Sequence, residues 1–419
     1  MSNTSTTPDN PLNGFLADTW WFALTRRLPD EAFAALVEKR VKQGFTAVQL
    51  VVGIPPEVGP EHESASSPVG FPWTLTGEFN EAYLAFARQR IGYLNAHGLR
   101  VIVYGAWGHQ IEWLGREQMT GWWRKIIATV DDLDVVYCLT GESNIWLWGE
   151  AQHLLPDKTT TGYSVNRLKQ LVGHLPYRVQ GWLIEWRRKT QRPYLEQKLN
   201  QRRQLWSQVL EGIITETNHP FIVHTLPHEV SSEVVTRPEL LAAVTTQTGH
   251  SETTRHLLWQ RPLAHQGRPF INLEPWYEGI NGQFGPADQL FAYWVSMLAG
   301  AQSYCYGAHG IWNVGDGRFL AHWGGQTFAD AAALDTPRLL GLSHQRFLEA
   351  RRENGRPFTE VHHNQLITIG QTWDDGLIQF FPDVAQAKTV PQGQIWLPRR
   401  GCWTEALPSS GQVVVFKTS

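Results

Sequence analysis

The chain has 419 residues, which is long enough for one large domain together with a small one. Its formal net charge is -3 and charges of both signs are interspersed, so no basic region favours binding to nucleic acid or anionic lipid. No apolar stretch approaches the ~18 residues that a membrane-spanning helix needs. We therefore expect neither a nucleic acid nor a membrane as a partner, and the oligomeric state stays open.

The N-terminal segment 1–13 is polar and lacks the basic-then-apolar order of a signal peptide. We expect this segment to be flexible and the protein to be cytoplasmic. The three cysteines, Cys138, Cys305 and Cys402, lie far apart, and no Cys or His spacing typical of a metal site occurs. The sequence therefore predicts no bound metal and no cofactor.

The segment 14–140 alternates short apolar runs with stretches of helical periodicity. The apolar runs predict strands at 14–17, 45–52, 100–104 and 135–140. The periodic stretches predict helices at 29–43, 78–97 and 117–131. Gly44 and Gly98 follow the first two helices, as is usual at helix C-termini. Residues 53–77 are rich in Gly, Pro, Ser and Glu, which predicts a long loop of the kind that shapes active sites.

The alternation resumes after an interruption at 143–200, which we interpret as an insertion. Further strands are predicted at 221–225, 242–248, 269–273 and 303–306. Further helices are predicted at 201–217, 253–265, 286–298 and 334–352. Eight strands that alternate with helices, without a dinucleotide-binding fingerprint, predict a (β/α)8 TIM barrel over residues 14–354.

The sequence pattern changes from about residue 356 onward. Short strands are predicted at 366–369, 377–381, 394–396 and 413–416, and Gly, Pro and Asp turns separate them. This pattern predicts a small all-β domain over residues 355–419. Its few strands leave little core for independent stability, so we expect it to pack on the barrel.

Two acidic residues follow predicted strands directly. Glu142 comes after the fourth strand and Glu274 after the seventh, and Pro275 holds Glu274 in an extended conformation. Carboxylates at the C-terminal ends of barrel strands lie at the mouth of the barrel, where active sites form. Paired carboxylates are typical of glycoside hydrolysis. Glu142 could instead cap a surface helix, and Glu278 is the chief rival of Glu274 for the role of nucleophile.

The chain contains 20 Trp, many of them beside Gly, His or acidic residues. Indole rings stack on sugars while the ring N–H reaches a hydroxyl, although they can equally fill gaps between barrel and helices. Three His residues also follow predicted strands, where a structural role is the alternative. The candidate substrate-binding residues are Asp18, Trp20, Trp107, His109, Asn144, His250, Trp276, Tyr277, Glu278, His309 and Trp312.

Several stretches together resemble the apiosidase-like glycoside hydrolases of family 140. They are GFLADTWW at 14–21, LPDE at 28–31, KQGFTAVQ at 42–49, TGH at 248–250, LEPWYEGI at 273–280, LAGA at 298–301 and YGAHGIW at 306–312. The resemblance covers roughly residues 14–352. It implies a clan A-type barrel in which Glu142 is the acid/base and Glu274 the nucleophile. The chain departs from the family where Glu142 stands, because many relatives carry Asp in that motif.

These features predict a retaining glycoside hydrolase that acts from the chain end on a small carbohydrate, a short glycoside or an oligosaccharide. Two long loops, 53–77 and 143–200, would close a cleft into a pocket that admits a chain end. One alternative is a catalytically silent carbohydrate-binding barrel. A second alternative is a metal-dependent barrel hydrolase or isomerase that uses the His residues as ligands. The sugar and its linkage stay open.

Overall fold

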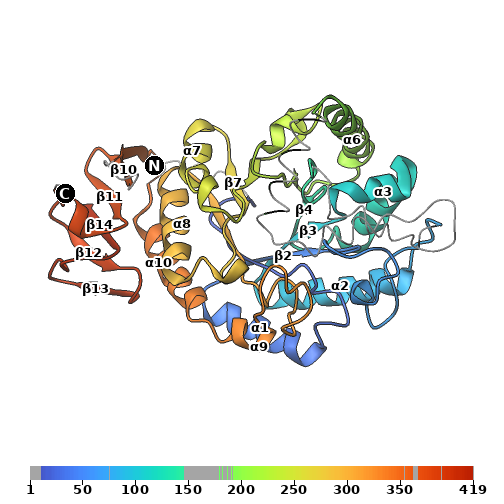
Figure 1. The fold of residues 1–419 in the computed structure, drawn as a ribbon, viewed down its shortest axis with the longest axis horizontal. Coiled ribbons are helices and arrows are strands. Elements are labelled where there is room, and N and C mark those ends of the chain that lie inside the picture. The colour runs from blue at the N-terminus through green and yellow to red at the C-terminus, as the bar shows by residue number, and fades with distance from the viewer. Residues whose placement is uncertain are drawn as a thin grey trace, which may run out of the picture.

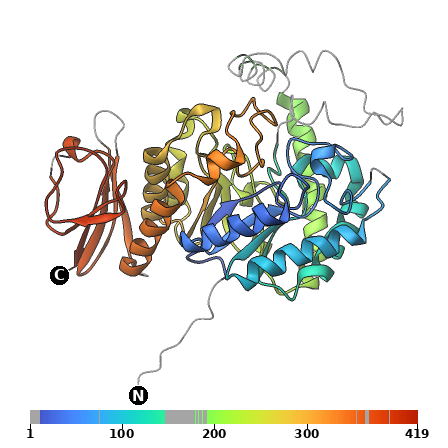
Figure 2. The same ribbon diagram turned by 90° about the horizontal axis from the view of Figure 1, so that it is seen from below.

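A computed structural model describes residues 11–418, apart from residues 75, 146–178, 180–181, 183–185, 187–189, 191, 353, 362–366 and 388. Its two sheets are an eight-stranded one and a six-stranded one (Figure 1). Helices surround the larger sheet on the outside, and the smaller sheet lies at one end of the molecule (Figures 1 and 2). The expected insertion at 143–200 falls mostly outside the described residues.

The eight-stranded sheet has the order β5-β4-β3-β2-β1-β8-β7-β6, and its strands pair in parallel. The strands are β1 (Leu16–Thr19), β2 (Ala47–Val51), β3 (Arg100–Tyr104), β4 (Val135–Cys138), β5 (Phe221–Ile222), β6 (Val244–Gln247), β7 (Phe270–Glu274) and β8 (Ser303–Tyr306). At the junction of β5 and β6, the Ala242 backbone N–H donates to the Phe221 carbonyl at 2.9 Å. The Thr245 hydroxyl also donates to the Val223 carbonyl there. The sheet is therefore nearly closed into a barrel, and the predicted fold class is confirmed.

The helices that surround the barrel are α1 (Asp30–Lys42), α2 (Glu81–Ala96), α3 (Ile111–Val130), α6 (Arg192–Ile213), α7 (Leu257–Ala264), α8 (Pro286–Leu298), α9 (Phe328–Ala332) and α10 (Thr336–Ala350). Local signals explain their ends: Asn80 caps α2 by accepting from the Tyr83 backbone N–H, and Pro286 begins α8. Helix α3 starts six residues before the predicted helix at 117–131 and kinks at Gly115, whose φ is 78°. Helix α6 begins within the expected insertion.

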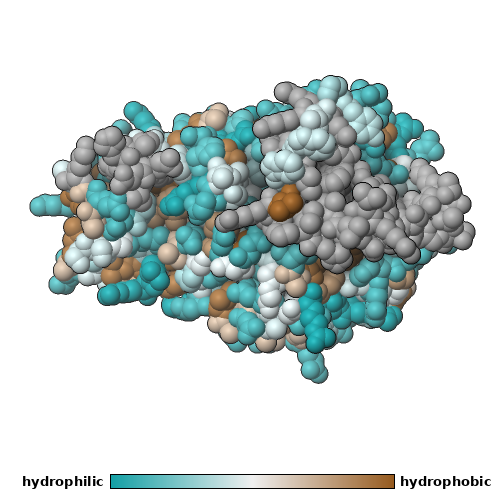
Figure 3. Space-filling view, in the orientation of Figure 1, coloured by the Kyte–Doolittle hydropathy of each residue, from teal (hydrophilic) through white to brown (hydrophobic). Residues whose placement is uncertain are grey.

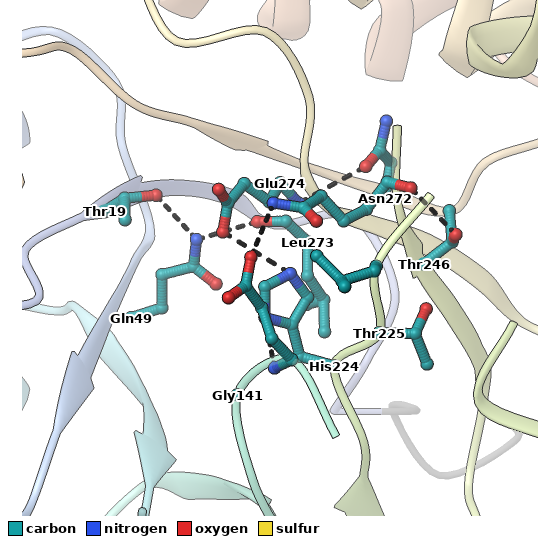
Figure 4. Close-up of polar contacts among 12 residues, drawn as sticks. Thr19, Gln49, Gly141, His224, Thr225, Thr246, Asn272, Leu273 and Glu274 are labelled. Carbon is teal, nitrogen blue, oxygen red and sulfur yellow. Dashed lines mark hydrogen bonds and ion pairs between the residues drawn. The ribbon is translucent and has the colours of Figure 1, made fainter. Parts of the chain in front are cut away.

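A buried polar cluster ties strands across the barrel interior. The Gln49 side-chain amide donates to the Thr19 hydroxyl at 2.6 Å and to the Leu273 carbonyl at 2.8 Å (Figure 4). The Tyr104 hydroxyl donates to the Gln49 side-chain oxygen at 2.9 Å. Buried polar groups must find partners inside the protein, so these bonds couple β1, β2, β3 and β7. They hold the end of β7 one residue before Glu274.

The smaller sheet is antiparallel, with the strand order β13-β12-β14-β11-β10-β9. Its strands are β9 (Arg356–Val361), β10 (Ile367–Trp373), β11 (Gly376–Phe381), β12 (Gln394–Leu397), β13 (Cys402–Thr404) and β14 (Val413–Thr418). Strands β9 and β13 are additional to the four that the sequence pattern predicts. The domain limits 14–354 and 355–419 stay a prediction.

One face of the small sheet packs on helix α8. The Trp294 ring lies 6.4 Å from the ring of Phe380 and 6.1 Å from that of Phe416, measured between centroids. The Gln371 side chain donates to the Met297 carbonyl at 3.2 Å, which adds a polar contact at the edge of this interface. The sheet and the barrel therefore share one hydrophobic core.

The face of the molecule in Figure 3 is mostly hydrophilic, and apolar residues lie scattered over it. Within the described part of the chain, no helix combines the length and the hydropathy needed to cross a bilayer.

We expect Trp294→Ala to lower the free energy of unfolding by about 3–5 kcal/mol, because it removes a buried ring from the shared core. Urea unfolding followed by circular dichroism measures this loss. Trp403→Ala is the matched control, since Trp403 lies on β13 of the small sheet and is 41% exposed. Equal losses in the two variants would show that the contact with α8 adds no stability.

Candidate active site

A pocket of about 220 Å³ opens at the C-terminal ends of the barrel strands. All eight strands contribute to it through the residues that follow them or end them. The lining residues are Trp21, Pro56, Glu57, Trp107, Glu142, Leu226, Pro227, Gln247, Gly249, His250, Glu274, Tyr277, Ile280, Trp312 and Trp323. The lining combines aromatic faces with three carboxyl groups, as expected where a polar ligand with apolar faces binds.

Glu142 lies in an unusual backbone conformation just after β4. Its φ is 40°, in the left-handed region that residues other than glycine rarely occupy. The preceding residue is Gly141, where a Cβ would lie only 2.3 Å from the Trp107 ring. The close approach brings the Trp107 indole N–H to 2.9 Å from Glu142 Oε2. The backbone strain thus accompanies a specific orientation of the carboxyl group.

The second carboxyl oxygen of Glu142 is held from the other side of the pocket. The Gln247 side-chain Nε2 donates to Glu142 Oε1 at 3.2 Å. The pKa of Glu142 is raised to about 8, first by burial and then by the negative charge of Glu274, while the Trp107 and Gln247 donors act in the opposite direction. Glu142 is therefore protonated at neutral pH.

Glu274 ends β7 and is 5% exposed. The His250 Nε2 lies 2.9 Å from Glu274 Oε1, and the His224 Nε2 lies 3.4 Å from Oε2 (Figure 4). Burial by itself raises the pKa of Glu274, but the His250 hydrogen bond and the two neighbouring imidazoles outweigh burial and hold the pKa below its usual value. Glu274 is therefore ionised at neutral pH.

The two histidines are oriented by backbone donors. The Glu142 backbone N–H donates to His224 Nδ1 at 3.3 Å, and the Tyr277 backbone N–H donates to His250 Nδ1 at the same distance. A ring nitrogen that accepts carries no proton, so each neutral imidazole has its N–H on Nε2. Burial lowers the pKa of His224 to about 4, in keeping with a neutral ring. His250 Nε2–H therefore donates to Glu274 Oε1, whereas His224 Nε2 lies beside Oε2 at 3.4 Å without a hydrogen bond to it.

Gln247 links the two carboxyl groups. In addition to its bond to Glu142, its side chain acts as a hydrogen-bond donor that lowers the pKa of Glu274. Glu142 and Glu274 therefore interact with the same amide group and with each other's charge. A protonated carboxyl and an ionised one in a single pocket can supply both a proton and a negative charge to a bound molecule.

Six of the residues predicted from the sequence come together in this pocket. They are Trp107, Glu142, His250, Glu274, Tyr277 and Trp312. The Tyr277 ring packs on His250 with a centroid distance of 4.6 Å, and the charge of Glu274 helps to raise the pKa of the Tyr277 hydroxyl.

Asp18 and Trp20 do not line the pocket. Asp18 is fully buried, and its Oδ2 accepts from Arg40 Nε at 2.6 Å and from Trp20 Nε1 at 2.7 Å. Its contacts are those of a buried ion pair that joins β1 to α1, so a direct bond to substrate is not supported. Of the adjacent tryptophans, Trp21 faces the pocket in place of Trp20.

Glu278 also lies outside the pocket lining. The Tyr306 hydroxyl donates to its Oε2 at 2.6 Å, and the Thr336 hydroxyl donates to Oε1 at 2.7 Å. Burial raises the pKa of Glu278, which favours its neutral form. These contacts do not support Glu278 as a rival of Glu274.

The remaining candidates are buried around the pocket and do not line it. The Trp276 ring stacks on Phe284, and its N–H donates to the Ser251 carbonyl at 3.3 Å. The Asn144 side chain donates to Glu229 at 2.5 Å, and His309 Nε2 lies 2.5 Å from the Gly324 carbonyl. His109 packs edge-on against Trp113. Each residue therefore contacts other parts of the protein and not the pocket.

Several lining or supporting residues were not predicted from the sequence. His224 and Gln247 follow β5 and end β6, but the predicted strands 221–225 and 242–248 were longer and enclosed both residues, so neither was recognised as lying at a strand end. Glu57 and Trp323 lie in long loops without periodicity, where the sequence offers no comparable signal. In the described part of the chain, no group of three or more His, Cys, Asp or Glu is arranged to hold a metal ion.

Comparison with solved structures shows the same architecture. A glycoside hydrolase of family 5 from Bacteroides vulgatus ATCC 8482 matches with a TM-score of 0.68 and 13% identity, covering 96% of this chain and 89% of its own. A structure described as a glycoside hydrolase gives 0.67 and 14% identity, covering 97% and 92%. A second structure from B. vulgatus ATCC 8482, described as a putative glycoside hydrolase, gives 0.56 and 11% identity, covering 98% and 79%. These matches support the barrel fold.

No curated protein sequence matches the chain. The family model described as "Apiosidase-like, catalytic domain" matches residues 10–333, which is well over half of the 419 residues. That range contains every strand of the barrel and every residue of the pocket. The chain therefore belongs to the apiosidase-like family and has the catalytic barrel of a glycoside hydrolase.

Proposed function

We propose that the protein is a retaining glycoside hydrolase in which Glu142 is the acid/base and Glu274 the nucleophile. The observation that carries this proposal is the opposite displacement of two pKa values within one pocket. Glycoside cleavage needs a proton on the leaving oxygen and negative charge beside an oxocarbenium-like carbon. Protonated Glu142 and ionised Glu274 supply these two requirements at neutral pH.

The first step joins Glu274 to the sugar. One Glu274 carboxylate oxygen attacks the anomeric carbon while the bond to the leaving oxygen breaks, and Glu142 transfers its proton to that oxygen. The product is a covalent glycosyl ester of Glu274. His250 donates its Nε2–H to Glu274 and His224 Nε2 lies 3.4 Å from it, and both imidazoles favour the ionised carboxylate before the attack.

The second step reverses the role of Glu142. Once Glu274 is esterified its negative charge is gone, so the repulsion that helped to raise the pKa of Glu142 is removed. Ionised Glu142 then takes a proton from water as the water attacks the anomeric carbon. The sugar leaves with its original configuration, and both carboxyl groups return to their starting states.

The shared contact with Gln247 supports retention over inversion. Retaining enzymes place their carboxyl groups ~5–5.5 Å apart, whereas inverting enzymes need ~6.5–9.5 Å to accommodate a water. Glu142 and Glu274 both interact with the side-chain amide of Gln247, which bridges only a short gap. A shared amide contact favours the shorter of these two separations.

The size of the pocket supports action on a chain end. About 220 Å³ lies below the ~300–1,000 Å³ of pockets that enclose drug-sized ligands. Trp21, Trp312 and Trp323 present aromatic surface to this space, on which a sugar ring can stack. We infer that the substrate is a short glycoside or oligosaccharide, cleaved at its non-reducing end. The name of the family makes apiose the first sugar to test.

Glu274→Ala should abolish hydrolysis of aryl glycosides because it removes the nucleophile. Added azide should restore turnover and give a glycosyl azide, which mass spectrometry identifies. Glu278→Gln is the matched control, since its carboxyl group lies outside the pocket, and it should keep most activity. Azide rescue of a Glu278 variant in place of the Glu274 variant would transfer the nucleophilic role to Glu278.

The value of kcat/KM should stay level at neutral pH and fall about tenfold per unit above pH 8, because Glu142 must be protonated and its pKa is about 8. It should also fall on the acidic side only below pH 4.5, since the pKa of Glu274 is held below 4.5. Glu142→Gln should remove the alkaline decline with a dinitrophenyl glycoside, whose leaving group needs no proton. Persistence of the decline in that variant would assign it to another group.

Proton NMR of the first product should show the anomeric configuration of the substrate before the sugar mutarotates. This outcome follows from two displacements at the anomeric carbon. Release of the opposite anomer would rule out a covalent intermediate on Glu274.

A further inference from the structure

A third carboxyl group in the pocket has no part in the two-step mechanism. Glu57 lies in the loop after β2, lines the pocket, and has a side chain that is only 17% exposed. Its φ of 65° places it in the left-handed region, which is unfavourable for a residue other than glycine. The chain thus presents an acidic side chain to the pocket from a strained position.

The loop after β8 supplies the contacts of Glu57. The Trp323 indole N–H hydrogen-bonds to the Glu57 carboxyl group, and the His322 Nε2 lies 3.8 Å from Glu57 Oε2. Glu57 and Trp323 both line the pocket, so this pair joins two loops along one wall. A carboxylate has about four acceptor sites, of which the indole uses one. The group therefore has the capacity to accept hydrogen bonds from a bound molecule as well.

The charge of Glu57 acts on the same space as that of the other carboxyl groups. Both groups line the same pocket, and the charge of Glu57 contributes to the raised pKa of Glu142. Burial raises the pKa of Glu57 itself to about 7. A carboxyl group enclosed in this way is costly unless a ligand or a partner uses it.

The neighbours of Glu57 fit a sugar. Trp21, Trp312 and Trp323 offer ring faces for the C–H surface of a pyranose or furanose, while a carboxyl oxygen accepts from hydroxyl groups at its edge. A ligand that itself carries a carboxylate would meet the ionised Glu274 and the acidic side chain of Glu57 in one small volume. Like charges in a partly buried site repel strongly.

Resting on the proposed hydrolase function, we propose that Glu57 determines substrate specificity by accepting hydrogen bonds from hydroxyl groups of the terminal sugar and by disfavouring sugars that carry a carboxylate. The competing interpretation is that Glu57 only fastens the two loops together through Trp323. The two interpretations differ in whether the fall in kcat/KM on replacing Glu57 depends on which hydroxyl groups the ligand has.

The test is a double-mutant cycle in which one change is made in the protein and the other in the ligand. The parent ligand is the nitrophenyl glycoside that the wild type hydrolyses fastest, and its monodeoxy analogues each lack one hydroxyl group. Glu57→Met removes the acceptor at similar length. Glu61→Met is the matched control, because Glu61 lies in the same loop with a φ of 63° but is exposed.

Glu57→Met should lower kcat/KM for the parent glycoside roughly 10- to 100-fold, as expected for a hydrogen bond to a charged group. With the wild type, kcat/KM should fall by a similar factor for one of the deoxy analogues. With Glu57→Met, kcat/KM for that analogue should be almost the same as for the parent glycoside. Glu61→Met should match the wild type. The proposal would be overturned if the substitution and the missing hydroxyl group lowered kcat/KM by independent factors for every analogue. Full activity of Glu57→Met would also overturn it. Either result would leave the hydrolase function standing.

Calorimetric binding of free pentoses and hexoses separates this inference from the hydrolase function. Binding by the wild type that Glu57→Met weakens supports the role of Glu57 even where no glycoside is hydrolysed. Equal binding by both proteins overturns it, and so does the absence of any binding and turnover by the wild type. If Glu57→Met does not fold, as judged by thermal unfolding, Glu57→Gln replaces it, with a smaller loss expected since the amide oxygen still accepts.

Discussion

The repulsion between two carboxyl groups in one enclosed pocket is the constraint on which the rest of the site depends. Two buried negative charges at close range are unfavourable, so the pair is more stable with one proton than with none. The surroundings decide which group keeps the proton. Glu274 accepts a hydrogen bond from His250 and lies beside a second imidazole, that of His224, whereas Glu142 receives donors that only partly offset its burial. The asymmetry of the donors thus creates the division between acid and nucleophile.

The barrel provides this asymmetry by placing one polar residue at the end of each of several strands. His224, Gln247 and Glu274 follow or end β5, β6 and β7, and parallel strands bring these ends to the same rim. The backbone N–H of Glu142 donates to His224, so the strained turn after β4 also orients a histidine that faces Glu274. Acid, histidine and nucleophile are therefore mechanically linked, and a shift of one strand end would disturb all three.

The sequence predicted the barrel well because the evidence for it is local. Short apolar runs that alternate with amphipathic stretches indicate buried parallel strands and covering helices, and a carboxylate after such a strand must lie at the rim. Glu142 and Glu274 were found in this way. The hydrophobic pattern was less informative about where α3 and α6 begin. It also did not reveal strands β9 and β13 in the small sheet.

By itself, the sequence determined the fold class and the position of the acidic pair, because hydrophobic periodicity and strand ends are properties of neighbouring residues. Only the tertiary structure decided which rim residues face the pocket. Trp21 faces it and Trp20 does not, because Asp18 accepts from the Trp20 ring and from Arg40 in a buried ion pair. Glu278 is four residues from Glu274, yet Tyr306 and Thr336 hold it elsewhere. Such choices depend on partners up to 58 residues away along the chain, and the sequence pattern around each residue does not contain them.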